Sequence, residues 1–184
     1  MNGNASSPTD SRLRGRICII TGGSSGLGRA TCLKLANSGA RIIVADLKSS
    51  GVEGEITNHH GQNSAIFIPC DVTKEDQIKA LIQKAVEFGG RLDVICNYAG
   101  VALEASKYSM SVRAHEMETS DWDAEMGINA RGVWLCCKYA LQQMLAQEPR
   151  EANARGERTR GWIVNAASML GCDLSTGLEK TGLG

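Results

Sequence analysis

The chain has 184 residues, with 20 basic and 20 acidic side chains, so its formal net charge at pH 7 is zero. A chain of this length is able to form one domain that buries roughly 70% of the surface exposed when unfolded. Without net charge there is no global field to attract nucleic acid or an anionic membrane, and no apolar run approaches the roughly 20 residues that span a bilayer. We therefore expect no nucleic acid and no membrane among its partners.

The cysteines and histidines show no metal-ligand spacing, so we expect no metal site. Most of the seven cysteines lie in apolar segments without a Cys-x-x-Cys pair, which indicates reduced core thiols. His59, His60 and His115 fall in polar segments and are expected to be solvated loop residues. Because residues 1–10 are polar and lack the apolar core of a secretory signal, a cytoplasmic location is expected.

A strand, a glycine-rich turn and a helix are predicted near the start of the chain. The apolar run at residues 17–20 leads into a turn with Gly22, Gly26 and Gly28, and residues 29–36 have the apolar spacing of a helix on a sheet. Such glycines permit close approach of a diphosphate to the main chain, and the helix N-terminus offers free N–H groups to an anion. This pattern predicts a dinucleotide phosphate site; a turn that serves only the backbone is the alternative.

A second buried strand, at residues 41–46, ends in Asp46. A dinucleotide fold places an acid here, roughly 20 residues beyond the glycine turn, to accept hydrogen bonds from the adenosine ribose. An aspartate that only caps the next turn is the alternative. Since a carboxylate repels a ribose 2′-phosphate, and Ser24 and Ser25 supply no basic side chain, NAD is favoured over NADP as the cofactor.

Strands and helices continue to alternate after Asp46. The predicted elements are a short helix with a loop at 48–61, a strand at 64–70, a helix at 75–88 and a strand at 92–96. Asp71 is a candidate contact for the adenine amino group, and Thr73 is expected to cap the helix that follows. The alternative is that this turn serves only to cap the helix and contacts no cofactor.

This alternation predicts an α/β fold with a doubly wound, mostly parallel sheet and helices on both faces. In such sheets ligands bind beyond the carboxyl ends of the strands, at the switch point. The glycine turn, Asp46, Asp71 and the turn that begins at Asn97 all follow predicted strands. We therefore expect them at one edge of the sheet.

These motifs together resemble the short-chain dehydrogenase/reductase (SDR) family. The matching segments are the turn at 21–28, Asp46, Cys70-Asp71-Val72, Asn97-Tyr98-Ala99-Gly100, Asn129-Ala130-Arg131-Gly132 and Ile163-Val164-Asn165-Ala166-Ala167-Ser168. Tyr98 is a departure, because the family often has a second asparagine there. The resemblance implies an incomplete NAD(P)-binding Rossmann domain over residues 15–171, after a flexible lead-in at 1–14 and before a divergent, irregular tail at 172–184.

The resemblance also implies a cofactor site and a reaction. The implied cofactor-binding residues are Gly22, Ser24, Ser25, Gly26, Leu27, Gly28, Asp46, Leu47, Asp71, Val72, Asn97, Ala99 and Gly100. The implied reaction is hydride transfer between nicotinamide and a secondary alcohol or ketone. Ser168 would steady the substrate oxygen, and Asn129 would support a catalytic lysine through water.

The tyrosine and lysine that the family uses as general acid and its partner are not found after Ser168. Lys180 and Thr181 stand near the expected place, and neither has the chemistry of the phenol. We therefore expect a C-terminally truncated member that lacks C-terminal strands and helices and is catalytically impaired. Two hypotheses stay open: an NAD-dependent oxidoreductase, and a non-catalytic dinucleotide-binding module that is inert or regulatory.

The remaining segments carry less information. Residues 101–121 are expected to form a helix or loop near the cleft entrance, 148–160 an exposed loop and 161–166 a fifth strand. A broad apolar face is predicted on a helix at 132–147, formed by Val133, Trp134, Cys137, Ala140, Leu141, Met144 and Leu145. The family resemblance implies a homo-oligomer through this helix, and a buried intramolecular face is the alternative.

Overall fold

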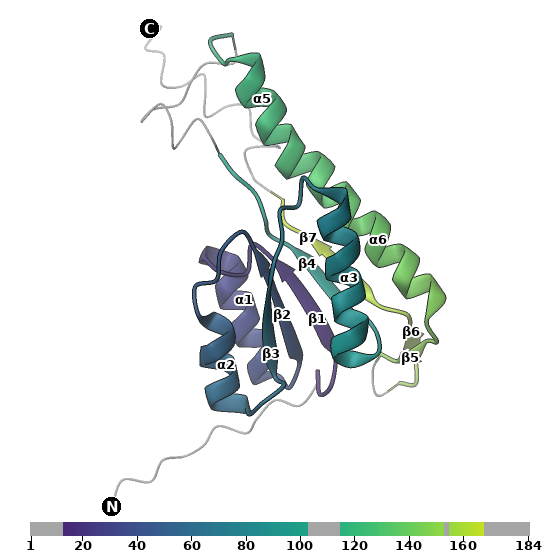
Figure 1. Cartoon of the computed structure of the whole chain (residues 1–184). Helices are drawn as coiled ribbons and strands as arrows, with labels where there is room; N and C mark the ends of the chain where they lie inside the picture. The colour runs from purple at the N-terminus through teal and green to yellow at the C-terminus, as the bar shows by residue number, and fades with distance from the viewer. Residues whose placement is uncertain (1–12, 103–114, 153–154, 168–184) are drawn as a thin grey trace, which may run out of the picture.

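A five-stranded parallel sheet in the order β3-β2-β1-β4-β7 forms the centre of the computed structural model (Figure 1). The structure describes residues 13–102, 115–152 and 155–167. The sheet strands are β1 (Ile17–Thr21), β2 (Arg41–Asp46), β3 (Ala65–Pro69), β4 (Val94–Asn97) and β7 (Trp162–Asn165). The helices are α1 (Gly26–Asn37), α2 (Val52–His60), α3 (Glu75–Gly89), α5 (Thr119–Met126), the π-helix η1 (Gly127–Gly132) and α6 (Val133–Ala146).

The two faces of the sheet are covered by different helices, which confirms the doubly wound α/β fold. Helices α1 and α2 lie on one face, and α3 and α6 lie on the other (Figure 1). Alternate residues of β1 supply the two cores: Ile17 and Ile19 pack with the α3 and α6 side, and Cys18 and Ile20 with the α1 and α2 side. The apolar runs are continuous because both faces are buried.

The strand order places the switch point of the sheet between β1 and β4. From β1 the chain proceeds through β2 to β3 on one side, and then returns to add β4 and β7 on the other. Loops at the carboxyl ends of β1 and β4 therefore leave in opposite directions and open a crevice between them.

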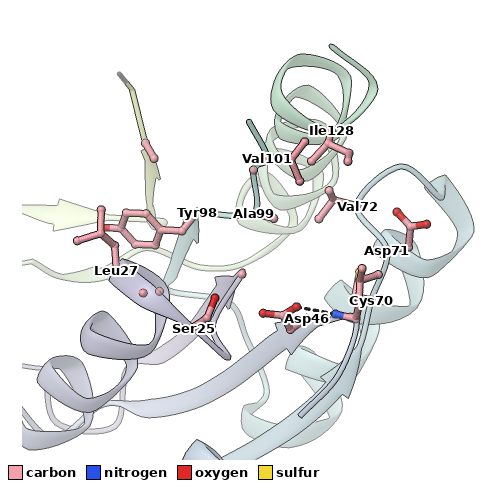
Figure 2. A pocket seen from close by; sticks show the side chains of 16 residues that line it. Ser25, Leu27, Asp46, Cys70, Asp71, Val72, Tyr98, Ala99, Val101 and Ile128 are labelled. Atoms are coloured by element: carbon pink, nitrogen blue, oxygen red, sulfur yellow. Dashed lines mark hydrogen bonds between the residues drawn. The ribbon is translucent and has the colours of Figure 1, made fainter. Parts of the chain in front are cut away.

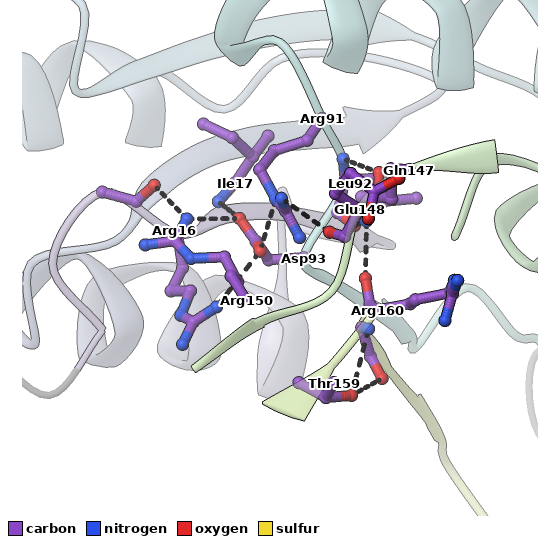
Figure 3. Close-up of polar contacts among 12 residues, drawn as sticks. Arg16, Ile17, Arg91, Leu92, Asp93, Gln147, Glu148, Arg150, Thr159 and Arg160 are labelled. Atoms are coloured by element: carbon purple, nitrogen blue, oxygen red, sulfur yellow. Dashed lines mark hydrogen bonds and ion pairs between the residues drawn. The ribbon is translucent and has the colours of Figure 1, made fainter. Parts of the chain in front are cut away.

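The opposite edge of the sheet holds a buried ion cluster centred on Asp93, which is 1% exposed. Its carboxylate accepts hydrogen bonds from the guanidinium groups of Arg16 (3.3 Å), Arg91 (2.9 Å) and Arg150 (3.4 Å), and from the Ile17 N–H group (3.0 Å) (Figure 3). One carboxylate thus neutralises part of the charge of three arginines. The cluster joins the start of β1, the start of β4 and the segment that follows α6.

That segment was expected to be an exposed loop, and this expectation is wrong in part. Strands β5 (Arg150–Glu151) and β6 (Arg158–Thr159) form a short antiparallel ladder. Each strand has two residues, too few to show an alternating pattern. The hairpin is held by long-range contacts instead: Arg150 binds Asp93, and Arg16 donates to the Glu151 carbonyl.

The apolar face predicted on helix α6 is only partly buried within the chain. Leu135, Cys136, Ala140 and Met144 are buried, whereas three residues assigned to the apolar face are exposed. These are Trp134 (58% exposed), Leu141 (50%) and Leu145 (72%). Because the helix is apolar on most sides, the spacing of its apolar residues is compatible with either of two stripes packing on the sheet. The sequence pattern therefore does not identify the buried stripe.

All six cysteines in the described part of the chain are free thiols, and five of them are buried. Burial raises the pKa of Cys70 and Cys96 to about 11, and that of Cys32 and Cys136 to about 12. These thiols keep their protons at neutral pH and pack as small apolar side chains. The core role expected of the cysteines in apolar segments is confirmed for Cys18, Cys32, Cys96 and Cys136, whereas Cys137 is only partly buried.

Candidate functional site

A cavity of about 420 Å³ opens at the carboxyl edge of the sheet, where the crevice was expected (Figure 2). Its lining residues are Gly22, Ser25, Gly26, Leu27, Gly28, Asp46, Leu47, Cys70, Asp71, Val72, Tyr98, Ala99, Gly100, Val101, Ile128 and Ala166. All of the residues suggested for cofactor binding line it except Ser24 and Asn97. The cavity therefore gathers groups from the carboxyl ends of all five strands of the sheet, together with Ile128 of the π-helix.

Five of the lining residues were not among the cofactor-binding predictions: Cys70, Tyr98, Val101, Ile128 and Ala166. Cys70, Tyr98 and Ala166 lie inside the quoted motifs, so their position in the motif was an available signal. Val101 directly follows the Asn97 turn, and Ile128 directly precedes Asn129. Adjacency to a motif was the only sequence signal for these two.

The glycine turn brings the N-terminus of α1 against β1. A Cβ atom on Gly28 would lie 2.1 Å from the Gly22 carbonyl oxygen, so only glycine allows this approach. Gly26 has φ +47°, and a Cβ there would meet nothing within 4 Å. It lines the cavity, so the backbone forms an open cradle.

The first turn of α1 suits an anion. No side chain caps it, and it contains no acidic residue. Its N–H groups and the positive end of the helix dipole are therefore directed at the cradle without a competing carboxylate from the helix. A diphosphate group fits this arrangement.

Asp46 connects the end of β2 to the glycine turn. Its Oδ2 atom accepts a hydrogen bond from the Ser24 N–H group (3.0 Å), and Oδ1 accepts one from the Leu47 N–H group (2.7 Å). Each carboxylate oxygen has a second lone pair, so the carboxylate retains capacity for the hydroxyl groups of a ribose. The Ser24 hydroxyl donates to the Lys48 carbonyl (2.7 Å), and Ser24 does not line the cavity.

Asp71 lines the cavity beyond β3 and organises its own turn. Its Oδ1 atom accepts hydrogen bonds from the Thr73 N–H group (2.9 Å) and hydroxyl group (2.7 Å). Burial opposes ionisation, but the two hydrogen bonds from Thr73 outweigh it and lower the pKa of Asp71. Thr73 is not the helix cap that was expected: the cap position of α3 is Lys74, and Thr73 is engaged by Asp71.

Asn97 lies beneath the cavity rather than on its wall, which differs from its predicted place. It is 2% exposed, and its Nδ2 atom donates to Asn165 Oδ1 at 2.8 Å. Its carbonyl accepts the Ala166 N–H group at 3.1 Å. Asn97 therefore joins the end of β4 to the end of β7.

Asn129, in η1, holds the segment that follows β4. Its Oδ1 atom accepts the Val101 N–H group (2.9 Å), and its Nδ2 atom donates to the Val101 carbonyl (2.7 Å). Val101 is thereby fixed as a wall of the cavity. Ser168, the other predicted catalytic residue, lies outside the described residues, two positions after Ala166.

Comparison with known proteins identifies the family. Residues 16–178 match the family model described as short chain dehydrogenase. This chain belongs to the short chain dehydrogenase family. The Rossmann-type sheet and the sequence resemblance to SDR proteins agree with this assignment.

Several curated short chain dehydrogenase relatives are similar over most of this chain. It is 33% identical to the 3-oxoacyl-[acyl-carrier-protein] reductase FabG of Thermotoga maritima over 161 residues, an alignment that covers 87% of this chain and 58% of the relative. It is 36% identical to 3-hydroxyacyl-CoA dehydrogenase type-2 of Drosophila melanogaster over 162 residues, or 88% of this chain and 60% of the relative. It is 37% identical to tropinone reductase-like 2 of Erythroxylum coca over 136 residues, or 74% of this chain and 48% of the relative. The chain thus spans about half to three fifths of these relatives.

Within the described ranges, no group of three or more His, Cys, Asp or Glu side chains has the arrangement of a metal site. No helix there has the length and apolar character needed to cross a membrane. His59 and His60 are exposed in the last turn of α2 rather than in a loop, and His115 is exposed.

Proposed function

We propose that the cavity binds NAD and that the chain is the cofactor-binding part of an oxidoreductase that acts on a secondary alcohol or ketone. The observation that carries this proposal is the pairing of an uncapped helix N-terminus at Gly26 with a carboxylate, Asp46, at the end of the adjacent strand. The relatives' names support the substrate class, since they specify oxoacyl and hydroxyacyl compounds and a tropinone.

Each part of the cavity has a proposed task. The amides of the glycine turn hold the diphosphate, Asp46 accepts hydrogen bonds from the adenosine ribose, and Asp71 and Val72 border the adenine. A bound nicotinamide would supply hydride transfer to or from the substrate carbon. Asn129 keeps Val101 in place as a wall of the cavity, and Ser168 steadies the substrate oxygen.

A second candidate function is a dinucleotide-binding module without catalysis. It is supported by Lys180 and Thr181, which stand near the place where the family has its general-acid tyrosine and do not have the chemistry of a phenol. General acid–base catalysis contributes about 10²–10⁴-fold to rate, so a site without that phenol is expected to be strongly impaired. The two candidates share the binding step and differ in turnover.

Titration with NADH, followed by assays with generic secondary alcohols and ketones, separates the candidates. Enhanced or quenched NADH fluorescence without turnover supports the binding module. Turnover well above the uncatalysed rate supports the oxidoreductase. If the folded chain leaves NADH fluorescence unchanged even at millimolar protein, both candidates are wrong.

Replacing Asp46 by asparagine is expected to weaken NAD binding by roughly 10-fold and to narrow the preference for NAD over NADP by a similar factor. The change removes the charge that repels a 2′-phosphate and one acceptor for the ribose. Calorimetric titration of both dinucleotides measures the ratio, with Asp123→Asn on the exposed surface of α5 as the matched control. An unchanged ratio would refute the role of Asp46.

We also propose that a second copy of the chain packs on the outer face of α6, which carries the exposed Trp134, Leu141 and Leu145. Contiguous apolar residues of this size on a helix favour an interface. The variant Leu141→Lys is expected to shift the chain to monomer in sedimentation velocity, whereas Gln83→Lys on α3 leaves the oligomer unchanged. A monomeric wild type at about 50 μM, far above typical homodimer dissociation constants, contradicts the proposal.

A further inference from the structure

Tyr98 departs from the family motif, and its side chain forms one end of the cavity. The residue lines the cavity and packs partly buried against the core beneath α1 and α2. Figure 2 shows its ring on the same side of the cavity as Leu27, away from Asp46 and Asp71. None of the roles assigned above uses this ring.

The backbone presents the Tyr98 ring from a fixed position. The Tyr98 N–H group donates to the Thr21 carbonyl (3.2 Å), and the Ala99 N–H group donates to the Thr21 hydroxyl (3.2 Å). Thr21 is 1% exposed, so these bonds lie in the interior. The main chain on both sides of Tyr98 is therefore tied to the strand that leads into the glycine turn.

The proposed binding mode determines which part of the dinucleotide reaches this ring. With the adenosine ribose at Asp46 and the diphosphate at Gly26, the second nucleoside extends away from Asp71. Leu27 and Tyr98 are the labelled walls on that side of the cavity (Figure 2). A flat apolar ring with a hydroxyl at its edge is complementary to a flat heteroaromatic ring that carries an amide.

We propose that the Tyr98 ring forms a contact surface for the nicotinamide ring, an assignment that rests on the proposed function. Tyr98 is then a specificity residue for the nicotinamide half of the cofactor. It discriminates the intact dinucleotide from fragments that share only the adenosine and diphosphate. The glycine turn and Asp46 bind both kinds of ligand equally.

Two ligands isolate this contribution: NADH, and ADP-ribose, which lacks only the nicotinamide. The variant Tyr98→Leu is expected to weaken NADH binding by about 3–10-fold and to change ADP-ribose binding by less than about twofold. Tyr98→Phe keeps the ring and is expected to bind both ligands nearly as the wild type does. Tyr139→Phe, on α6 outside the cavity, is the matched control and leaves both affinities unchanged.

The outcomes distinguish this assignment from the proposed function. Equal weakening of both ligands by Tyr98→Leu, or no weakening of either, overturns the role of Tyr98 while leaving the dinucleotide site intact. A wild type that binds neither ligand overturns the proposed function and this assignment together.

A second measurement covers the case in which Tyr98→Leu does not fold. In protein whose three tyrosines are isotopically labelled, nuclear Overhauser cross-peaks are expected between the protons of one tyrosine ring and the nicotinamide protons of bound NADH. These contacts should vanish in Tyr98→Phe. Their absence in the wild type, or their persistence in Tyr98→Phe, overturns the assignment.

Discussion

Substituting alanine for Gly28 is expected to abolish detectable NADH binding and to lower the free energy of unfolding by about 3 kcal/mol. The added Cβ atom would lie 2.1 Å from the Gly22 carbonyl oxygen and 2.7 Å from the Gly22 carbonyl carbon. Both are backbone atoms, so no side chain is able to move aside. Helix α1 must withdraw from the turn, and the amides of its first turn then no longer meet the diphosphate.

Urea unfolding and NADH titration of Gly28→Ala measure the two effects. The control is Gly54→Ala in α2, where a Cβ atom meets nothing within 4 Å. That change is expected to stabilise the chain by about 0.5–1 kcal/mol, because alanine favours a helix, and to leave binding intact. Wild-type NADH affinity in Gly28→Ala would show that the cradle is not the binding site.

Replacing Asp93 by alanine is expected to destabilise the chain by about 3–5 kcal/mol, since it leaves buried arginines without their counter-charge. Arg16 and Arg91 are mostly buried, and together with Arg150 they share this one carboxylate (Figure 3). The Ile17 N–H group also loses its acceptor. The midpoint of urea unfolding is the measurement.

Two comparisons test the cause of the Asp93 effect. Asp123→Ala, at an exposed position of α5, is expected to change stability by less than about 0.5 kcal/mol. The double variant Asp93→Ala/Arg150→Ala should be less destabilised than additivity predicts, because it removes one of the unpaired charges. A loss below about 1 kcal/mol for Asp93→Ala would show that water or another group replaces the carboxylate.

The sheet could be predicted from the sequence because a strand buried on both faces is a continuous apolar run. This holds for β1, β2 and β4, which are buried almost throughout. The more exposed β3 and β7 were found from their apolar residues alone, and no predicted bound differs from the observed one by more than two residues. The β5–β6 hairpin could not be found, because two-residue strands have no periodicity and depend on contacts between Arg150 and Asp93 that are distant in sequence. The buried stripe of α6 was missed because the helix is apolar on most sides.

The cavity could be predicted where its residues belong to motifs at strand ends, as for Gly26, Asp46 and Asp71. Polar side chains that form hydrogen bonds within the protein, and not with a ligand, were harder to assign. Asn97 was predicted to contact the cofactor because it lies in a motif at a strand end. Its side-chain amide instead donates to Asn165, which joins the end of β4 to the end of β7. Residue type and position alone do not distinguish an amide that faces a ligand from one that joins neighbouring strands.

The central position of β1 has a consequence for the order in which the chain acquires its structure. One neighbour of β1 is made soon after it, but the other, β4, is separated from it by three helices and two strands. At about 5–20 residues per second of translation, the edge of β1 that pairs with β4 waits several seconds on the ribosome for its partner. An early half-sheet of β1, β2 and β3, covered by α1 and α2 on one face only, is therefore the species that chaperones would meet first.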